Sequence, residues 1–229
     1  MLKLMTGGFR LIRRDAMLLL LLIAPWLAGA ALGLGLPALS PLLRSAFALD
    51  LSPWYPLADM LTLMLTPMMA GMLSGFLMLD ERDEGVGAYY AVTPVGGVRY
   101  LVSRLSLPVL WSVAVAPLLM AAFSLSHPAL VRVLAIALVG GLCASSSALL
   151  LLAFAGNKVE GLAVSKMLGV ILLPAVIPFL TASPWAMAAG VFPAYWMGAM
   201  LAGPLYLFFP GVGVSLLWLW VLYRKLSAR

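Results

Sequence analysis

Charged side chains are scarce in this sequence: aspartate, glutamate, lysine and arginine together make up 10% of its 229 residues. Apolar residues make up 64%, and several runs of more than 20 residues carry no charge at all. A transmembrane helix needs about 20 consecutive apolar residues, whereas a soluble core of this size needs no such runs. The composition therefore excludes an ordinary soluble domain and predicts an all-α membrane protein with one domain, residues 1–229.

Residues that carry catalysis or bind metals are also rare. Cys143 is the single cysteine, so it cannot form a disulfide within the chain, and we expect it to be buried in an apolar run. His127 is the single histidine and has no cysteine or acid near it in sequence with which to bind a metal. The motifs HExxH, CxxC and GxSxG are missing, as is the glycine–lysine pair of a phosphate-binding loop. We therefore expect no enzymatic activity, metal or cofactor in this chain.

Two further classes of protein are disfavoured by where the charges lie. The net charge of +6 is spread over short connections between apolar runs, so it does not form the basic patch that binds nucleic acid. No pair of acids lies within an apolar run, although carriers driven by protons or sodium usually bind the coupling ion there. If the chain takes part in active transport, the energy must come from another polypeptide.

The basic residues also predict the topology. Of the 14 lysines and arginines, only Arg44 and Arg132 lie in connections that would face outward if the N-terminus faces inward. Since basic residues concentrate on the cytoplasmic side, we expect both termini in the cytoplasm and an even number of spans. The six expected transmembrane helices cover residues 16–36, 57–79, 105–126, 133–156, 162–181 and 204–223.

The N-terminal region has three expected parts. Residues 1–14 mix basic and apolar side chains, which is typical of an amphipathic helix on the inner membrane surface and also of a frayed basic tail. The apolar run that follows is about twice as long as the hydrophobic region of a signal peptide, so we expect a retained span. Residues 37–56 contain four prolines and are expected to form an outer loop.

The last apolar stretch is too long for two simple spans. Residues 167–223 contain no charge, and an unbroken helix of that length would measure roughly 85 Å, nearly three bilayer cores. An even number of spans leaves residues 183–203 as a segment that does not cross. Because two prolines and two glycines interrupt it, we expect a re-entrant or interfacial helical hairpin on the outer side, between the fifth and sixth spans.

The second expected span carries two distinct faces. Gly71 and Gly75 lie four residues apart, as do Gly29 and Gly33 in the first span, and such pairs let another helix approach closely. A flexible methionine stripe on another face suits a path for varied apolar substrates, although packing or lipid contact is the more common role. The stripe consists of Met60, Met64, Met68 and Met72.

The one dense block of charge follows this span. Residues 80–84 hold four of the chain's eight acids, and two glycines, a tyrosine pair and a Thr-Pro pair come soon after. Charged and aromatic side chains in this order suit a docking surface for a partner protein, but they also suit a solvated connecting loop. The candidate contact residues are Glu81, Arg82, Gly85, Val86, Tyr89, Tyr90, Thr93 and Pro94.

The segment ERDEGVGAYYAVTPVGGVRYLVSRL, residues 81–105, resembles the region after the second span of type-2 ABC exporter permeases. In that family an E-R/K-x-x-G-T/V motif precedes a Thr-Pro pair and a basic return into the third span. Val86 stands where threonine is more common. The expected layout is similar too, with an inner amphipathic N-terminal helix, six spans and a broken outer segment before the last span. It is closest to the bacterial drug- or peptide-exporting members.

The resemblance implies a permease subunit in a bacterial inner membrane that pairs with a second copy or a sister permease. It implies cytoplasmic ATP-binding subunits, which bind ATP and magnesium and touch the loop of residues 80–104. Asn157, Lys158 and Glu160, in the next inner loop, are a candidate second contact. The expected substrate is an apolar or amphipathic drug, peptide or lipid-like molecule leaving the cytoplasm. The alternative is a non-transporting scaffold or assembly factor that docks a soluble partner through the same loop.

Overall fold

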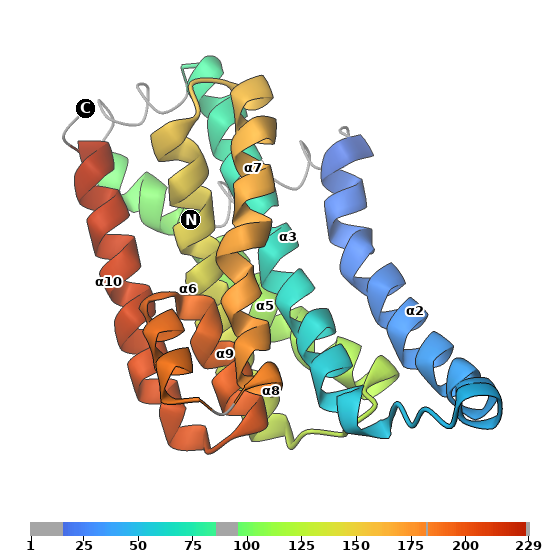
Figure 1. Ribbon diagram of the computed structural model, residues 1–229. Coiled ribbons are helices and arrows are strands. Elements are labelled where there is room, and N and C mark those ends of the chain that lie inside the picture. The colour runs from blue at the N-terminus through green and yellow to red at the C-terminus, as the bar shows by residue number, and fades with distance from the viewer. Residues whose placement is uncertain (1–15, 86–95, 182, 228–229) are drawn as a thin grey trace.

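The computed structural model describes residues 16–85, 96–181 and 183–227, and these residues form helices and no strands (Figure 1). Six helical stretches are long and apolar enough to cross a membrane, so the predicted all-α membrane fold with six spans is confirmed. The expected amphipathic helix of residues 1–14 lies outside the described residues. The spans are Leu18–Phe47, Ser52–Asp83, Arg99–Phe123, Leu130–Phe154, Lys158–Leu180 and Leu205–Ser227.

The helices follow one another along the chain with short connections. The first four long helices are α2 (Ala16–Phe47), α3 (Tyr55–Asp83, preceded by the short η1, Ser52–Trp54), α5 (Gly96–Phe123) and α6 (Leu130–Phe154). The fifth span combines α7 (Lys158–Leu172), η2 (Leu173–Val176) and α8 (Ile177–Leu180). After it come η3 (Pro184–Val191), α9 (Pro193–Ala202), η4 (Leu205–Leu207) and α10 (Phe208–Ser227).

Helices α3 and α6 form the centre of the bundle, since 72% of the most apolar window of each is buried. Glycines on α3 allow the two to approach closely, as predicted. A Cβ atom added at Gly71 would lie 2.7 Å from the carbonyl oxygen of Ala144 on α6, and one at Gly75 would meet Leu151. Gly29 and Gly33 of α2 pack in the same way against Phe123 at the end of α5. By contrast, only 17% of the corresponding window is buried in α2 and in α10.

The expected loop of residues 37–56 is wrong for its first part, because α2 continues to Phe47 with Pro37 and Pro41 inside it. A proline removes one backbone hydrogen bond and crowds the preceding turn, but it does not forbid the residues on either side from staying helical. These two prolines are four residues apart, so both lost bonds fall on one face of the helix. The helix ends where Ala48 adopts a positive φ of 54°.

The segment before the last span forms the expected non-crossing helical hairpin from η3 and α9 (Figure 1). Helix α9 packs against η2, α6 and α10, and most of its residues are buried. The indole N–H of Trp196 donates to the carbonyl oxygen of Gly190 at 2.8 Å, and that of Trp218 on α10 donates to Val191 at 2.8 Å. These two bonds hold η3 against α9 and the last span.

In Figure 1 the end of α3, the start of α7 and the end of α10 all lie at the top of the bundle. The turns between α2 and α3 and between α5 and α6 lie at the bottom, together with the hairpin. The described start of α2 and end of α10 are therefore at the same end, which fits an even number of spans.

The tightest helix contact gives a stability prediction. A Cβ atom at Gly198 of α9 would clash with the carbonyl oxygen of Ala175 in η2, whereas one at Gly213 of α10 would meet nothing within 4 Å. We expect Gly198→Ala to destabilise the protein by about 1–3 kcal/mol, as overpacking does in other cores. Gly213→Ala is the matched control and should leave the thermal unfolding midpoint in detergent unchanged or slightly raised. Equal midpoints for the two variants would contradict the close contact.

Candidate functional site: the charged end of helix α3

Three consecutive charged residues at the end of α3 bind three different helices. Asp80 pairs with Lys158 at the start of α7, Glu81 with Arg104 on α5, and Arg82 with the last carbonyl groups of α6. Successive side chains on an α-helix point about 100° apart, so three neighbours can face three directions. We call Asp80, Glu81, Arg82 and the groups that they bind the α3 hub.

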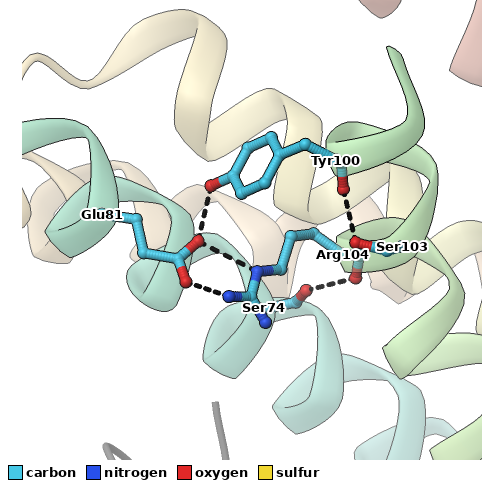
Figure 2. Close-up of polar contacts among 5 residues, drawn as sticks. All are labelled: Ser74, Glu81, Tyr100, Ser103 and Arg104. Atoms are coloured by element: carbon cyan, nitrogen blue, oxygen red, sulfur yellow. Dashed lines mark hydrogen bonds and ion pairs between the residues drawn. The ribbon is translucent and has the colours of Figure 1, made fainter. Parts of the chain in front are cut away.

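The contact between Glu81 and Arg104 is the most buried part of the hub (Figure 2). Their side chains are 4% and 5% exposed. Arg104 donates from Nε to Glu81 Oε2 at 2.9 Å and from Nη2 to Glu81 Oε1, so the guanidinium binds both carboxylate oxygens. The hydroxyl of Tyr100 also donates to Oε2. Burial removes the hydrogen bonds that these two charges would make with water. The bidentate pair and the third donor, Tyr100, replace them.

The sequence explains why these groups meet. Tyr100 and Arg104 are four residues apart on α5 and so lie on one face of that helix, as Figure 2 shows. Ser74 lies seven residues before Glu81, on the same face of α3, and its hydroxyl donates to the carbonyl oxygen of Arg104 at 3.0 Å. Ser103 donates to the carbonyl oxygen of Tyr100 at 2.7 Å. The start of α5 is thus joined to the last three turns of α3 by side-chain and backbone groups alike.

The other two contacts of the hub are more accessible to solvent. Lys158 Nζ lies 2.9 Å from Asp80 Oδ2, with side chains 30% and 32% exposed. Arg82 Nη1 donates to the carbonyl oxygens of Leu152 at 3.3 Å and Ala155 at 3.5 Å. Leu152 lies in the last turn of α6 and Ala155 is its C-cap residue, and carbonyl groups at a helix C-terminus lack intrahelical partners. Arg82 therefore caps α6 from the neighbouring helix.

Helix α7 begins beside the hub because its own first residues cap it. Asn157 Oδ1 accepts a hydrogen bond from the backbone N–H of Glu160 at 2.9 Å, and Glu160 Oε2 accepts one from Gly156 at 2.7 Å. This reciprocal arrangement is similar to a capping box, with the Glu160 carboxylate bound to the N–H of the residue before the N-cap Asn157. It fixes the start of α7, so that Lys158, the next residue, reaches Asp80. The predicted second contact thus lies next to the first.

The structure places Glu81 differently from our expectation. We expected its carboxylate to face a partner protein, but it is buried and occupied by Tyr100 and Arg104 within the chain. The reason is that α3 continues through Asp83, so Glu81 lies on the helix face that packs against α5. Gly85 follows the C-cap residue Glu84 of α3 with a φ of 72°, and its N–H donates to the carbonyl oxygen of Arg82. The other candidate contacts, Val86, Tyr89, Tyr90, Thr93 and Pro94, lie outside the described residues.

The methionine stripe lies inside the bundle of a single copy. Met60 and Met64 belong to the main apolar core, Met68 packs against that core, and Met72 packs against a second cluster nearer the hub. This arrangement agrees with the packing role that we considered the more common one. Whether any substrate touches these side chains stays a prediction.

Sequence reasoning missed a second buried carboxylate on α3, at the opposite end from the hub. Asp59 is 1% exposed and accepts hydrogen bonds from Leu125 N at 2.9 Å, Ser126 N at 2.7 Å and Ser126 Oγ at 2.5 Å. It therefore holds the turn between α5 and α6. An acid near the end of an apolar run was the only signal in the sequence. Among residues 16–85, 96–181 and 183–227, no group of three metal-ligating side chains is arranged to hold an ion.

Comparison with known proteins assigns the chain to a family. The family model described as fluoroquinolones export permease protein Rv2686c-like matches residues 8–223. Two relatives in Mycobacterium tuberculosis are fluoroquinolones export permease protein Rv2686c, from strain H37Rv, and MT2760, from strain CDC 1551. Each is 34% identical over 228 residues, which cover 94% of this chain and 89% of the relative. No solved structure matches the chain.

The buried pair of the hub gives a prediction that a double-mutant cycle can test. Removing one partner leaves the other charge buried and unpaired, so Glu81→Leu and Arg104→Met should each destabilise the purified protein by about 3–5 kcal/mol. The double variant should be less destabilised than either single variant, because two apolar residues leave no unpaired charge. Thermal unfolding in detergent measures this, with the exposed Glu84→Gln as a control that changes little. Additive effects of the two substitutions would contradict the pairing.

Proposed function

Because the chain belongs to the Rv2686c-like family of fluoroquinolones export permease proteins, we propose that it is the membrane-spanning subunit of an ATP-driven exporter of the ABC type. In this proposal a separate cytoplasmic subunit binds ATP and magnesium and hydrolyses the ATP. The permease moves an apolar or amphipathic compound out of the cytoplasm. The chain itself carries out no catalysis.

The observation that carries this proposal is the position of the α3 hub. The hub overlaps the segment of residues 81–105 that resembles the region after the second span of ABC exporter permeases, since Glu81, Arg82 and Arg104 belong to both. It joins the end of α3 to α5, α6 and α7. A displacement of residues 85–94 by a partner would therefore reach four helices through direct polar contacts. Lys158 belongs to the hub, which supports a role for Asn157, Lys158 and Glu160 beside the same partner.

The proposed orientation of the chain in the membrane follows from the distribution of its basic residues. With the hub on the cytoplasmic side, both ends of the chain and 12 of its 14 basic residues are cytoplasmic, as the positive-inside rule favours. The hairpin of η3 and α9 then lies on the outer side of a bacterial inner membrane. This orientation puts the loop of residues 80–104 on the side of the membrane where ATP is available.

The substrate class rests on the relatives and on the packing of the spans. The names of both relatives specify fluoroquinolones, which are planar aromatic compounds with polar groups. We propose an amphipathic aromatic compound of this kind for the present chain. Its path would run between two permease copies, because the methionine stripe is packed within one copy. The outer spans offer weakly buried faces for such pairing, with 17% of the apolar window buried in α2 and 28% in the fifth span.

A substitution in the loop of residues 80–104 tests the proposed contact with the ATP-binding subunit. Replacing both Tyr89 and Tyr90 by alanine should remove apolar contacts with the ATP-binding subunit while leaving the hub intact. We expect copurification with the co-expressed subunit to fall severalfold or more. The control is Tyr206→Ala, since Tyr206 is 68% exposed and belongs to η4, at the start of the last span and far from this segment in sequence. Unchanged copurification of the tyrosine-pair variant would exclude this segment as the main contact.

Transport itself is tested in inverted membrane vesicles that contain the permease with its ATP-binding subunit. Uptake of a fluorescent fluoroquinolone should require ATP and should be lost when a non-hydrolysable ATP analogue replaces ATP. Vesicles with the permease alone serve as the control. ATP-dependent assembly without any uptake would favour the scaffold alternative, and uptake driven by an ion gradient without ATP would refute the ABC mechanism.

A further inference from the structure

The last turn of α10 presents two exposed cations, Arg224 and Lys225. Neither is paired with a carboxylate among the residues that the structure describes. Neither α10 nor its neighbour α6 contains an acidic residue. A basic pair at a helix C-terminus complements the helix dipole, but it gains little from that alone when exposed. The pair therefore leaves positive charge available to a ligand.

Aromatic rings hold both cations at the rim of the bundle. The Arg224 guanidinium lies 4.7 Å from the centroid of the Trp220 ring, and Lys225 Nζ lies 3.6 Å from the centroid of the Phe154 ring, on the last residue of α6. Trp220 and Phe154 are each 53% exposed. The Lys225 contact bridges α10 and α6, so the two cations are positioned over a surface made by two helices.

The exposed face of α10 below these cations is apolar. Leu216, Leu217, Trp220, Val221 and Arg224 recur at positions that share one face of a helix. The four apolar residues are each at least 50% exposed in this chain. From Leu216 to Arg224 the helix rises about 12 Å, so the face leads from within the acyl region to headgroup level. Tyr223, 39% exposed, adds an amphipathic ring of the kind enriched at that level.

We propose that Arg224 and Lys225, with Trp220 and Phe154, form a binding surface for the phosphate headgroup of an anionic phospholipid, whose acyl chain lies along the apolar face of α10. The occupant follows from the chemistry: unpaired cations match a phosphodiester, and the adjoining apolar stripe matches a hydrocarbon chain. The site shares no side chain with the α3 hub, although Phe154 lies between Leu152 and Ala155, whose carbonyl groups Arg82 binds. It does not depend on the proposed transport function.

Native mass spectrometry of the purified full-length chain tests this surface. The protein is equilibrated with equimolar phosphatidylglycerol and phosphatidylcholine of identical acyl chains, and the ratio of retained adducts is measured. The wild-type chain should retain phosphatidylglycerol preferentially. In the variant R224Q/K225Q the ratio of phosphatidylglycerol to phosphatidylcholine adducts should fall about fivefold for each charge removed. The reason is that a basic residue at an anionic membrane surface contributes about 1 kcal/mol. A preference equal to that of the wild type would overturn the proposal.

Two control variants separate this site from general effects. R99Q/K166Q removes the same charges from exposed residues of α5 and α7, and it should keep the wild-type ratio. An equal loss in this control would mean that net charge alone attracts the lipid, which also overturns the proposal. R224K/K225R keeps both charges and should keep most of the preference. If R224Q/K225Q fails to give monodisperse protein, the single variants R224Q and K225Q, with about half of the effect each in free energy, decide the outcome.

Discussion

The buried ion pair between Glu81 and Arg104 is the interaction on which the arrangement of the helix ends around the α3 hub depends. Two opposite charges within a bundle of apolar helices are tolerated only when each is fully paired, and here the carboxylate receives three donated hydrogen bonds from Tyr100 and Arg104. This requirement fixes the register of α5 against α3. Asp59 does the same at the other end of α3, where it binds the turn that follows α5. Since α3 and α5 are joined at both ends by buried carboxylates, we infer that they move as one unit.

Close helix packing extends this unit to α6. At Gly71 and Gly75 the backbone of α6 lies so near α3 that a side chain on either glycine would meet it. The described core between these helices is packed with methionines among other side chains, which supports the proposed transport path between copies. Movement applied at the α3 hub would shift the α3, α5 and α6 group as a whole. Among the contacts of the hub, the more exposed pair of Asp80 and Lys158 would cost the least free energy to break during such a shift.

Much of the fold could be predicted because the bilayer imposes strict rules on composition and length. Uncharged runs located the six spans, and the distribution of basic residues predicted an even number of them. The prolines and glycines within residues 183–203 predicted the hairpin. Predictions from local sequence were wrong where packing against other helices decides the structure. Pro37 and Pro41 suggested a loop, yet the helix continues through both. The position of Glu81 depends on Arg104, which lies 23 residues away on a helix whose orientation no local pattern specifies. The methionine period identified one face of α3 but not what that face contacts.

The central claim is that the α3 hub lies on the cytoplasmic side and next to the ATP-binding subunit. Cys143 is the single cysteine and is buried, so Cys143→Ala gives a cysteine-free background in which Glu84→Cys, in the exposed residue that caps α3, can be labelled selectively. A membrane-impermeant maleimide should label this variant in inverted vesicles and not in intact cells, and co-expression of the ATP-binding subunit should reduce the labelling. Labelling in intact cells, with none in inverted vesicles, would contradict the account.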